Sequence, residues 1–78
     1  MIGKTVRWES GGVEKVGRVL AFVPAKASID IRALREKGTV KINSHRSNKD
    51  RLVVLVARGK PGATPRIYGP TADRVEVA

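Results

Sequence analysis

The sequence predicts a mainly β domain of five or six short strands with one short helix inserted midway, and three observations support this class. Apolar residues gather in short runs, and the first run alternates with polar residues as a half-buried strand does. Turn segments that contain glycine and proline separate the runs. One stretch, Ser28–Lys37, carries helix-capping residues instead. Short strands in this number favour a small, partly open barrel.

One domain over residues 1–78 is expected, because a chain of this length buries only about 60% of the surface that its unfolded form exposes. The chain has no cysteine, which excludes disulfides and thiolate zinc sites. Its first residues lack the apolar segment of a signal peptide, and no apolar run approaches the roughly 20 residues that cross a bilayer. We therefore expect a cytoplasmic protein with no membrane partner.

The first two strands are predicted to form a hairpin. Thr5–Ser10 alternates and places Trp8 on its buried face, and Gly11-Gly12 can adopt the positive φ angles of a tight turn. Val13–Val23 should then return antiparallel to the first strand. Gly17 interrupts this second strand, and a glycine there predicts a bulge or a sharp bend.

Two apolar runs predict central strands. Val19–Val23, which includes Phe22, has no polar alternation, so we expect burial on both faces until Pro24 ends the strand. The run enclosed by Arg51 and Arg58 has the same character and should form the second central strand of the core.

The predicted helix lies between these central strands. Ser28 can cap its first turn, Asp30 favours that turn, and Lys37 favours the last. Gly38 can take the left-handed position that often ends a helix.

Shorter elements complete the chain. Val40–Ile42 predicts a brief strand, and a polar loop follows over residues 43–50. Residues 59–65 read as a mobile connection, and two short strands are expected at residues 66–68 and 75–77.

Several segments resemble known families. Gly3–Trp8 resembles the opening strand of the SH3-like small barrels of the KOW and Tudor type, and Val16–Val19 resembles the hydrophobic-Gly-x-hydrophobic signature of their second strand. The chain is also similar to short uncharacterised proteins of phages and prophage-bearing bacteria. That similarity rests on Gly17–Ala25, Ser44–Ser47, Arg51–Val56, Tyr68–Pro70 and Val75–Val77. The resemblance implies an SH3-like barrel that binds nucleic acid or a protein tail and has no catalytic machinery.

Positive charge is the main functional signal in the sequence. Sixteen Lys and Arg stand against seven Asp and Glu, which gives a net charge of +9. From Lys37 to Arg66 there are eight cations, and Asp50 is the only anion. A partner that neutralises this charge is a reasonable inference, although a merely solubilising basic surface is the alternative.

The predicted partner is nucleic acid, DNA or RNA, bound through its phosphates. Of the three aromatic residues, Phe22 is expected in the core and Trp8 is placed there in preference to a stacking role, so Tyr68 is the best candidate for a surface contact. The residues predicted to bind nucleic acid are Lys41, Arg46, Lys49, Arg51, Arg58, Lys60, Arg66 and Tyr68. The rival hypothesis is a protein-interaction or assembly module of a phage or prophage system.

Catalysis is not expected. The chain has one histidine, His45, beside Ser44 and Ser47 in a predicted loop, and its acids are scattered singly. A lone histidine without paired carboxylates cannot complete a metal site. We therefore predict no cofactor, no metal and no small-molecule substrate.

Overall fold

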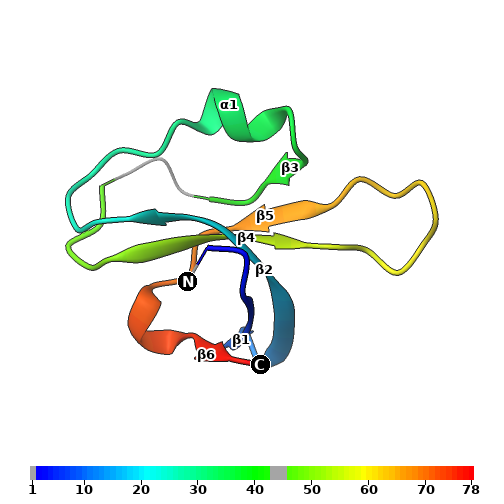
Figure 1. The fold of residues 1–78 in the computed structure, drawn as a ribbon, viewed down its shortest axis with the longest axis horizontal. Helices are drawn as coiled ribbons and strands as arrows, with labels where there is room; N and C mark the ends of the chain where they lie inside the picture. The colour runs from blue at the N-terminus through cyan, green and yellow to red at the C-terminus, as the bar shows by residue number, and fades with distance from the viewer. Residues whose placement is uncertain (1, 43–45) are drawn as a thin grey trace.

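The computed structural model describes residues 2–42 and 46–78, and the described chain is mainly β, as predicted (Figure 1). Its six strands form one open sheet in the order β3-β5-β4-β2-β1-β6, with one short α-helix inserted before β3. The elements are β1 (Thr5–Ser10), β2 (Val13–Val23), α1 (Ile31–Arg35), β3 (Thr39–Val40), β4 (Arg51–Val56), β5 (Arg66–Tyr68), the 3₁₀ helix η1 (Ala72–Arg74) and β6 (Glu76–Val77).

The predicted β1–β2 hairpin is confirmed. Ser10 pairs with Val13 across a two-residue turn, and both turn glycines have positive φ, 58° at Gly11 and 79° at Gly12. Glycine meets this requirement without steric cost, and a turn of this kind matches the twist of the strands that it joins. The hairpin register places Trp8 opposite Lys15.

The irregularity in β2 lies later than predicted. The register between β2 and β4 shifts between Val19 and Ala21, not at Gly17, which keeps regular pairing with β1. Gly17 serves a different purpose: a Cβ there would overlap the carbonyl oxygen of Leu55 and come within 2.7 Å of Val54 Cγ1. The glycine therefore allows β4 to approach β2 closely. β2 pairs with β1 from Val13 to Arg18 and with β4 from Arg18 onward, and the strand is strongly curved (Figure 1).

The core has two halves, and β4 separates them. Leu52 and Val54 pack in a first cluster with Val6, Trp8 and Val19, whereas Val53 packs in a second cluster with Val23 and Ile67. In Figure 1, β1 and β6 lie on one side of β4, and α1 and β3 lie on the other. The prediction that β4 is a central strand buried on both faces is confirmed.

The chain after β5 encloses the first cluster. It returns along the start of β4, where the Leu52 N–H donates to the Pro70 carbonyl (2.9 Å) and the Ala72 N–H donates to the Asp50 carbonyl (2.8 Å). After η1, strand β6 pairs with β1 at Val6 and Arg7. The six strands thus form one open sheet, with β3 and β6 at its two edges.

The inserted helix is present but shorter than Ser28–Lys37. Its N-cap is Asp30, not Ser28, because Asp30 Oδ1 accepts a hydrogen bond from the Ala33 N–H (3.1 Å). Gly38 has no positive φ and so is not a left-handed cap. A Cβ at Gly38 would lie 2.5 Å from the carbonyl oxygen of Pro65, so this glycine permits close packing against the chain before β5.

Phe22 corrects a prediction about β2. Val19 and Val23 are buried as expected, but the Phe22 side chain is 47% exposed. The pairing of β1 with β2 reaches only as far as Arg18 along β2, so β1 does not cover this end of the strand. Within residues 2–42 and 46–78, no helix is long and apolar enough to cross a membrane.

Candidate nucleic-acid interface

A hollow of about 410 Å³ lies where the end of β1 meets the segment that follows β5. It contains three cations, Lys41, Lys49 and Arg74, and one carboxylate, Glu9. We call it the basic hollow, and its lining residues are Trp8, Glu9, Ser10, Lys41, Lys49, Tyr68, Gly69, Pro70, Thr71 and Arg74. The surplus of cations makes this hollow suitable for an anion.

Backbone contacts position the three cations. The Lys41 N–H donates to the Ile67 carbonyl (2.7 Å), which holds Lys41 beside β5 just after β3 ends. The Lys49 N–H donates to Ser47 Oγ (3.1 Å), a local turn contact before β4. Arg74 is the last residue of η1. Three segments that are distant in sequence therefore bring their charges together.

One cation of the basic hollow is partly neutralised. Lys49 Nζ lies 3.2 Å from Asp73 Oδ2, and the side chains are 66% and 59% exposed. The pKa of Asp73 lies below its ordinary value of 3.8, mainly because of the nearby Thr71 hydroxyl and then because of Lys49. An ion pair this exposed is weak, so a phosphate can compete for Lys49.

Tyr68 holds two more cations at the margin of the basic hollow. Lys15 Nζ lies 4.7 Å from the ring centroid, a cation–π distance. The pKa of the Tyr68 hydroxyl lies below 10.0, chiefly because of a side-chain hydrogen bond with Arg66 and, to a smaller extent, because of Lys15. Trp8 meets the same ring in a T-shaped contact, with 6.0 Å between centroids. Tyr68 therefore organises charge, which differs from the stacking surface that the sequence suggests.

The predicted site residues divide into groups. Lys41, Lys49 and Tyr68 line the basic hollow, and Arg66 joins them through Tyr68. Arg46 is exposed in the segment before β4 but does not line the hollow. Arg58 and Lys60 are exposed beyond the other end of β4. The structure therefore brings half of the predicted set together.

Arg51 does not belong to an exposed surface. Its side chain is 6% exposed, and its Nε and Nη2 atoms are buried. Arg51 is the first residue of β4, pairs with Val23, and forms a bridge to Thr71 on its other side. Strand β2 on one side and the segment around Thr71 on the other enclose Arg51. Its predicted contact with nucleic acid is therefore wrong for this fold.

Sequence reasoning missed Lys15 and Arg74. A signal for Lys15 was present, because a two-residue Gly11-Gly12 turn fixes the register that sets Lys15 opposite Trp8. No local pattern points to Arg74, whose position depends on the return of the chain after β5. Ser44 and His45, which were considered for catalysis, lie outside the described residues.

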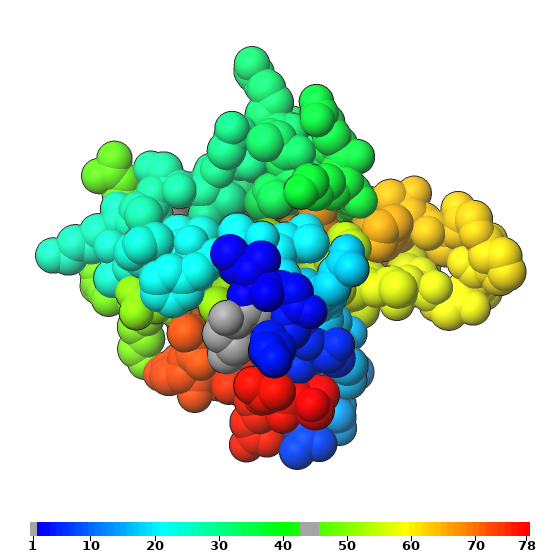
Figure 2. Space-filling view, viewed as in Figure 1, coloured from blue at the N-terminus to red at the C-terminus, as the bar shows by residue number. Residues whose placement is uncertain are grey.

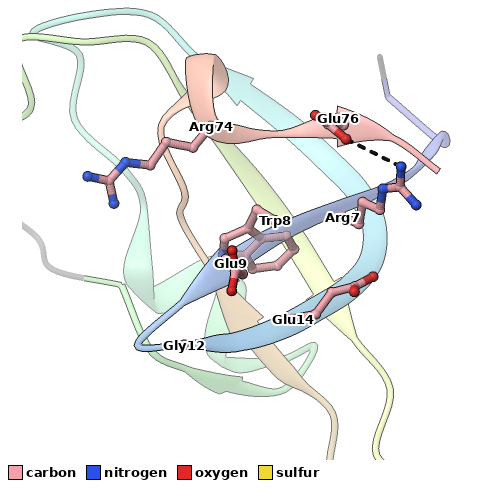
Figure 3. A pocket seen from close by; sticks show the side chains of 7 residues that line it. All are labelled: Arg7, Trp8, Glu9, Gly12, Glu14, Arg74 and Glu76. Atoms are coloured by element: carbon pink, nitrogen blue, oxygen red, sulfur yellow. Dashed lines mark hydrogen bonds and ion pairs between the residues drawn. The ribbon is translucent and has the colours of Figure 1, made fainter.

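A second hollow, of about 560 Å³, has the opposite character (Figure 3). It contains three carboxylates, Glu9, Glu14 and Glu76, and we call it the acidic hollow. Its other lining residues are Arg7, Trp8, Gly12 and Arg74. Arg7 Nη2 contacts Glu76 Oε2 at 3.4 Å, which is the dashed line in Figure 3. Glu9 and Glu14 face each other across the hairpin, a like-charge pair that repels anions.

The described residues contain no group of three or more His, Cys, Asp or Glu side chains that could hold a metal ion. No protein-family model, curated protein or solved structure matches this chain. The geometry and charge of the site are therefore the basis on which a function is proposed.

Proposed function

We propose that this protein is a non-enzymatic, cytoplasmic binding module that holds the backbone of a nucleic acid in and around the basic hollow. The observation that carries the proposal is the presence of five cations from separate segments in the basic hollow and around the Tyr68 ring at its margin. They are Lys15, Lys41, Lys49, Arg66 and Arg74. Glu9 in the lining and Asp73 beside Lys49 oppose them, and Arg74 also borders the acidic hollow, where Glu14 and Glu76 lie.

Phosphate contact is the chemistry that this set supports. Lysine ammonium and arginine guanidinium groups bind phosphate oxygens without reading sequence, and each neutralised phosphate of a duplex adds about 0.9 to the salt slope. Five cations of which one is shared with Asp73 predict a slope of roughly −4 in log K against log salt.

Base stacking contributes little to the proposed mechanism. Trp8 is 6% exposed, and the Tyr68 ring already contacts Trp8 and Lys15. Phe22 is the one aromatic with a large exposed fraction. Backbone contacts therefore dominate, and sequence specificity is not part of the proposal.

An SH3-like barrel of the KOW and Tudor type, related to phage proteins, is part of the same proposal. The support for it is the resemblance of Gly3–Trp8 and Val16–Val19 to strands of those barrels. The curled sheet, in which β6 returns to pair with β1, is compatible with a small barrel.

The test is a salt titration. Labelled duplex DNA, duplex RNA and single strands are titrated with the protein by fluorescence anisotropy, at salt concentrations from about 50 to about 200 mM. The triple variant Lys41→Ala/Lys49→Ala/Arg74→Ala should make the salt slope less steep, by roughly two to three in magnitude. The matched control Arg32→Ala/Arg35→Ala/Lys37→Ala removes the same charge from exposed positions of α1 and the turn after it.

The control should keep a slope close to that of the unmodified protein. An equal decrease in the steepness of the salt slope in both triple variants would mean that only net charge matters. The basic hollow would then have no specific role in binding. Absence of binding at low salt would end the nucleic-acid proposal.

A second candidate function is a protein-interaction or assembly module of a phage or prophage system. The acidic hollow favours it, because β6 pairs with β1 only at Val6 and Arg7 and so leaves the remainder of that strand edge open beside Glu9. An open strand edge can pair with an extended peptide. Binding of a lysine-rich peptide that disappears in Glu9→Gln/Glu14→Gln would support this candidate, and no peptide binding would remove it.

A further inference from the structure

The connection between β4 and β5 projects from the body of the protein. Figure 1 shows it as a long loop beyond the sheet, and Figure 2 shows it as a narrow extension, yellow in both views. We call residues 57–65 the β4–β5 arm. Residues 57–62 are all exposed, and a Cβ placed at Gly59 would meet no atom within 4 Å.

The tip of the β4–β5 arm is a defined turn, although the sequence suggested a mobile connection. The Ala63 N–H donates to the Lys60 carbonyl (3.1 Å), and Gly62 has a φ of 76°. Pro61 and Gly62 thus take the central positions of a type II turn, for which proline and then glycine are the preferred residues. At the base, Val56 pairs with Arg66, and the Pro65 carbonyl accepts from the Thr39 N–H (2.9 Å).

The β4–β5 arm is narrow and basic. Its only charged residues are Arg58 and Lys60, and its other residues are Ala, Gly, Pro and Thr. The strand pairing ends at Val56 and Arg66, so residues 57–65 form an unpaired loop, whose small side chains add little to its width. Such a loop can enter a groove that would exclude a bulkier element.

The β4–β5 arm and the basic hollow are linked along β5. Arg66 and Tyr68 are two residues apart on this strand and therefore share a face. Arg66 follows the arm directly, and Tyr68 lines the basic hollow. Cations thus run from the arm tip, through Arg66, to the hollow.

We propose that the β4–β5 arm enters the major groove of duplex DNA while the basic hollow holds the flanking phosphate backbone. This inference rests on the proposed function and names its substrate. The major groove of B-DNA is about 12 Å wide and admits an element as wide as an α-helix, so it has room for this projecting loop, whereas the minor groove is about 6 Å wide. The major groove of duplex RNA is deep and too narrow to be read. Duplex DNA is therefore the preferred partner.

The span of the site fits this pose. Seven residues, Asp50 and the six of β4, separate Lys49 from the arm, and β4 alone spans roughly 20 Å. That length exceeds the width of the major groove, so an arm inside the groove leaves the basic hollow over phosphates at its border.

The experiment compares duplex DNA and duplex RNA of matched sequence at one salt concentration, using the full chain. Arg58→Ala/Lys60→Ala should weaken binding of duplex DNA about tenfold or more and binding of duplex RNA only slightly. The control Arg32→Ala/Arg35→Ala removes equal charge from α1, and it should affect both duplexes equally and weakly. The arm variant should unfold at the same urea concentration as the unmodified protein, because both side chains are exposed.

Competition with the unmodified protein gives a second measurement. Methyl green, which occupies the major groove, should displace the protein from duplex DNA, and netropsin, which occupies the minor groove, should not. Equal affinity for both duplexes, with equal effects of arm and control variants, would overturn the groove assignment. If the triple variant Lys41→Ala/Lys49→Ala/Arg74→Ala still weakened binding in that case, the proposed function would stand without the groove assignment. Absence of any binding would overturn both.

Discussion

Lys15 Nζ lies 4.7 Å from the centre of the Tyr68 ring, although Lys15 belongs to β2 and Tyr68 belongs to β5. Trp8 connects the two, because it pairs with Lys15 on the neighbouring strand and meets the Tyr68 ring edge-on. Tyr68 is also the single tyrosine of the chain. Its ionisation therefore reports on the charge at the margin of the basic hollow without interference.

Native Tyr68 should ionise below 10.0, its ordinary pKa, because Arg66 and Lys15 favour the phenolate. At neutral pH the hydroxyl is protonated in both the folded and the unfolded chain, so its ionisation does not contribute to the free energy of unfolding at that pH. Its contribution to stability appears as the pH rises through the folded pKa and is complete above 10.0. Phenolate absorbance against pH measures the midpoint, and Arg66→Ala should raise it more than Lys15→Ala. A native midpoint at or above that of the urea-unfolded chain would contradict this.

A bound polyanion should raise the pKa of Tyr68. Phosphates that neutralise Arg66 and Lys15 remove the two cations that favour the phenolate. The same absorbance titration with saturating inorganic polyphosphate, which does not absorb in this range, checks the shift. An unchanged midpoint with polyphosphate bound would place the anion elsewhere on the protein.

Asp73→Asn should strengthen binding of duplex DNA. Asp73 Oδ2 holds Lys49 Nζ at 3.2 Å, and removal of the carboxylate frees that ammonium for a phosphate. A roughly two- to fivefold gain at low salt is expected, because the lost ion pair is exposed and weak. Glu36→Gln makes an equal charge change at the end of α1 and serves as the control in the same anisotropy assay. Equal gains in both variants would argue for net charge alone.

Gly17→Ala should destabilise the fold. The added Cβ would overlap the Leu55 carbonyl oxygen and crowd Val54 Cγ1, and overpacking of this kind costs about 1–3 kcal/mol. Gly59→Ala is the matched control, since a Cβ there meets nothing within 4 Å, and its effect should stay within about 0.5 kcal/mol. Urea unfolding followed by Trp8 fluorescence measures both. Similar stabilities would mean that β2 and β4 can separate without cost.

Arg51→Ala should affect stability and leave the salt slope of DNA binding unchanged. The buried side chain packs beside the Val23 and Thr71 pairings, and its loss should cost about 2 kcal/mol. Arg51→Met keeps most of the buried volume and should recover part of that loss. A reduced salt slope in Arg51→Met at full folding would return Arg51 to the binding surface.

Local patterns predicted much of the fold. The glycine pair at Gly11-Gly12 indicated the hairpin because few other residues adopt two consecutive positive φ angles. The uninterrupted apolar run of β4 indicated burial on both faces. Ser28 as a cap and Asp30 in the first turn indicated that a helix was present, although the structure has Asp30 as the cap. Each of these features depends on residues that are close in sequence.

The candidate site was predicted less well because it depends on contacts between distant segments. Lys41 and Lys49, which the sequence selected, line the basic hollow, but Arg74 reaches it only because the chain after β5 returns along β4. Arg51 was taken as a surface cation because it flanks an apolar run, yet the same return of the chain encloses it. A basic composition indicated the chemistry of the partner but could not select the residues that meet it.

Val53 and Val54 are adjacent in β4, but their side chains belong to different core clusters. If β4 separated from one cluster, it would also expose the side chains of the other cluster. Neither half of the core can therefore open alone. Amide hydrogen exchange at these two positions should therefore proceed only through global unfolding, with the same protection at both. The protein should therefore unfold as one cooperative unit, although its core is divided into two clusters.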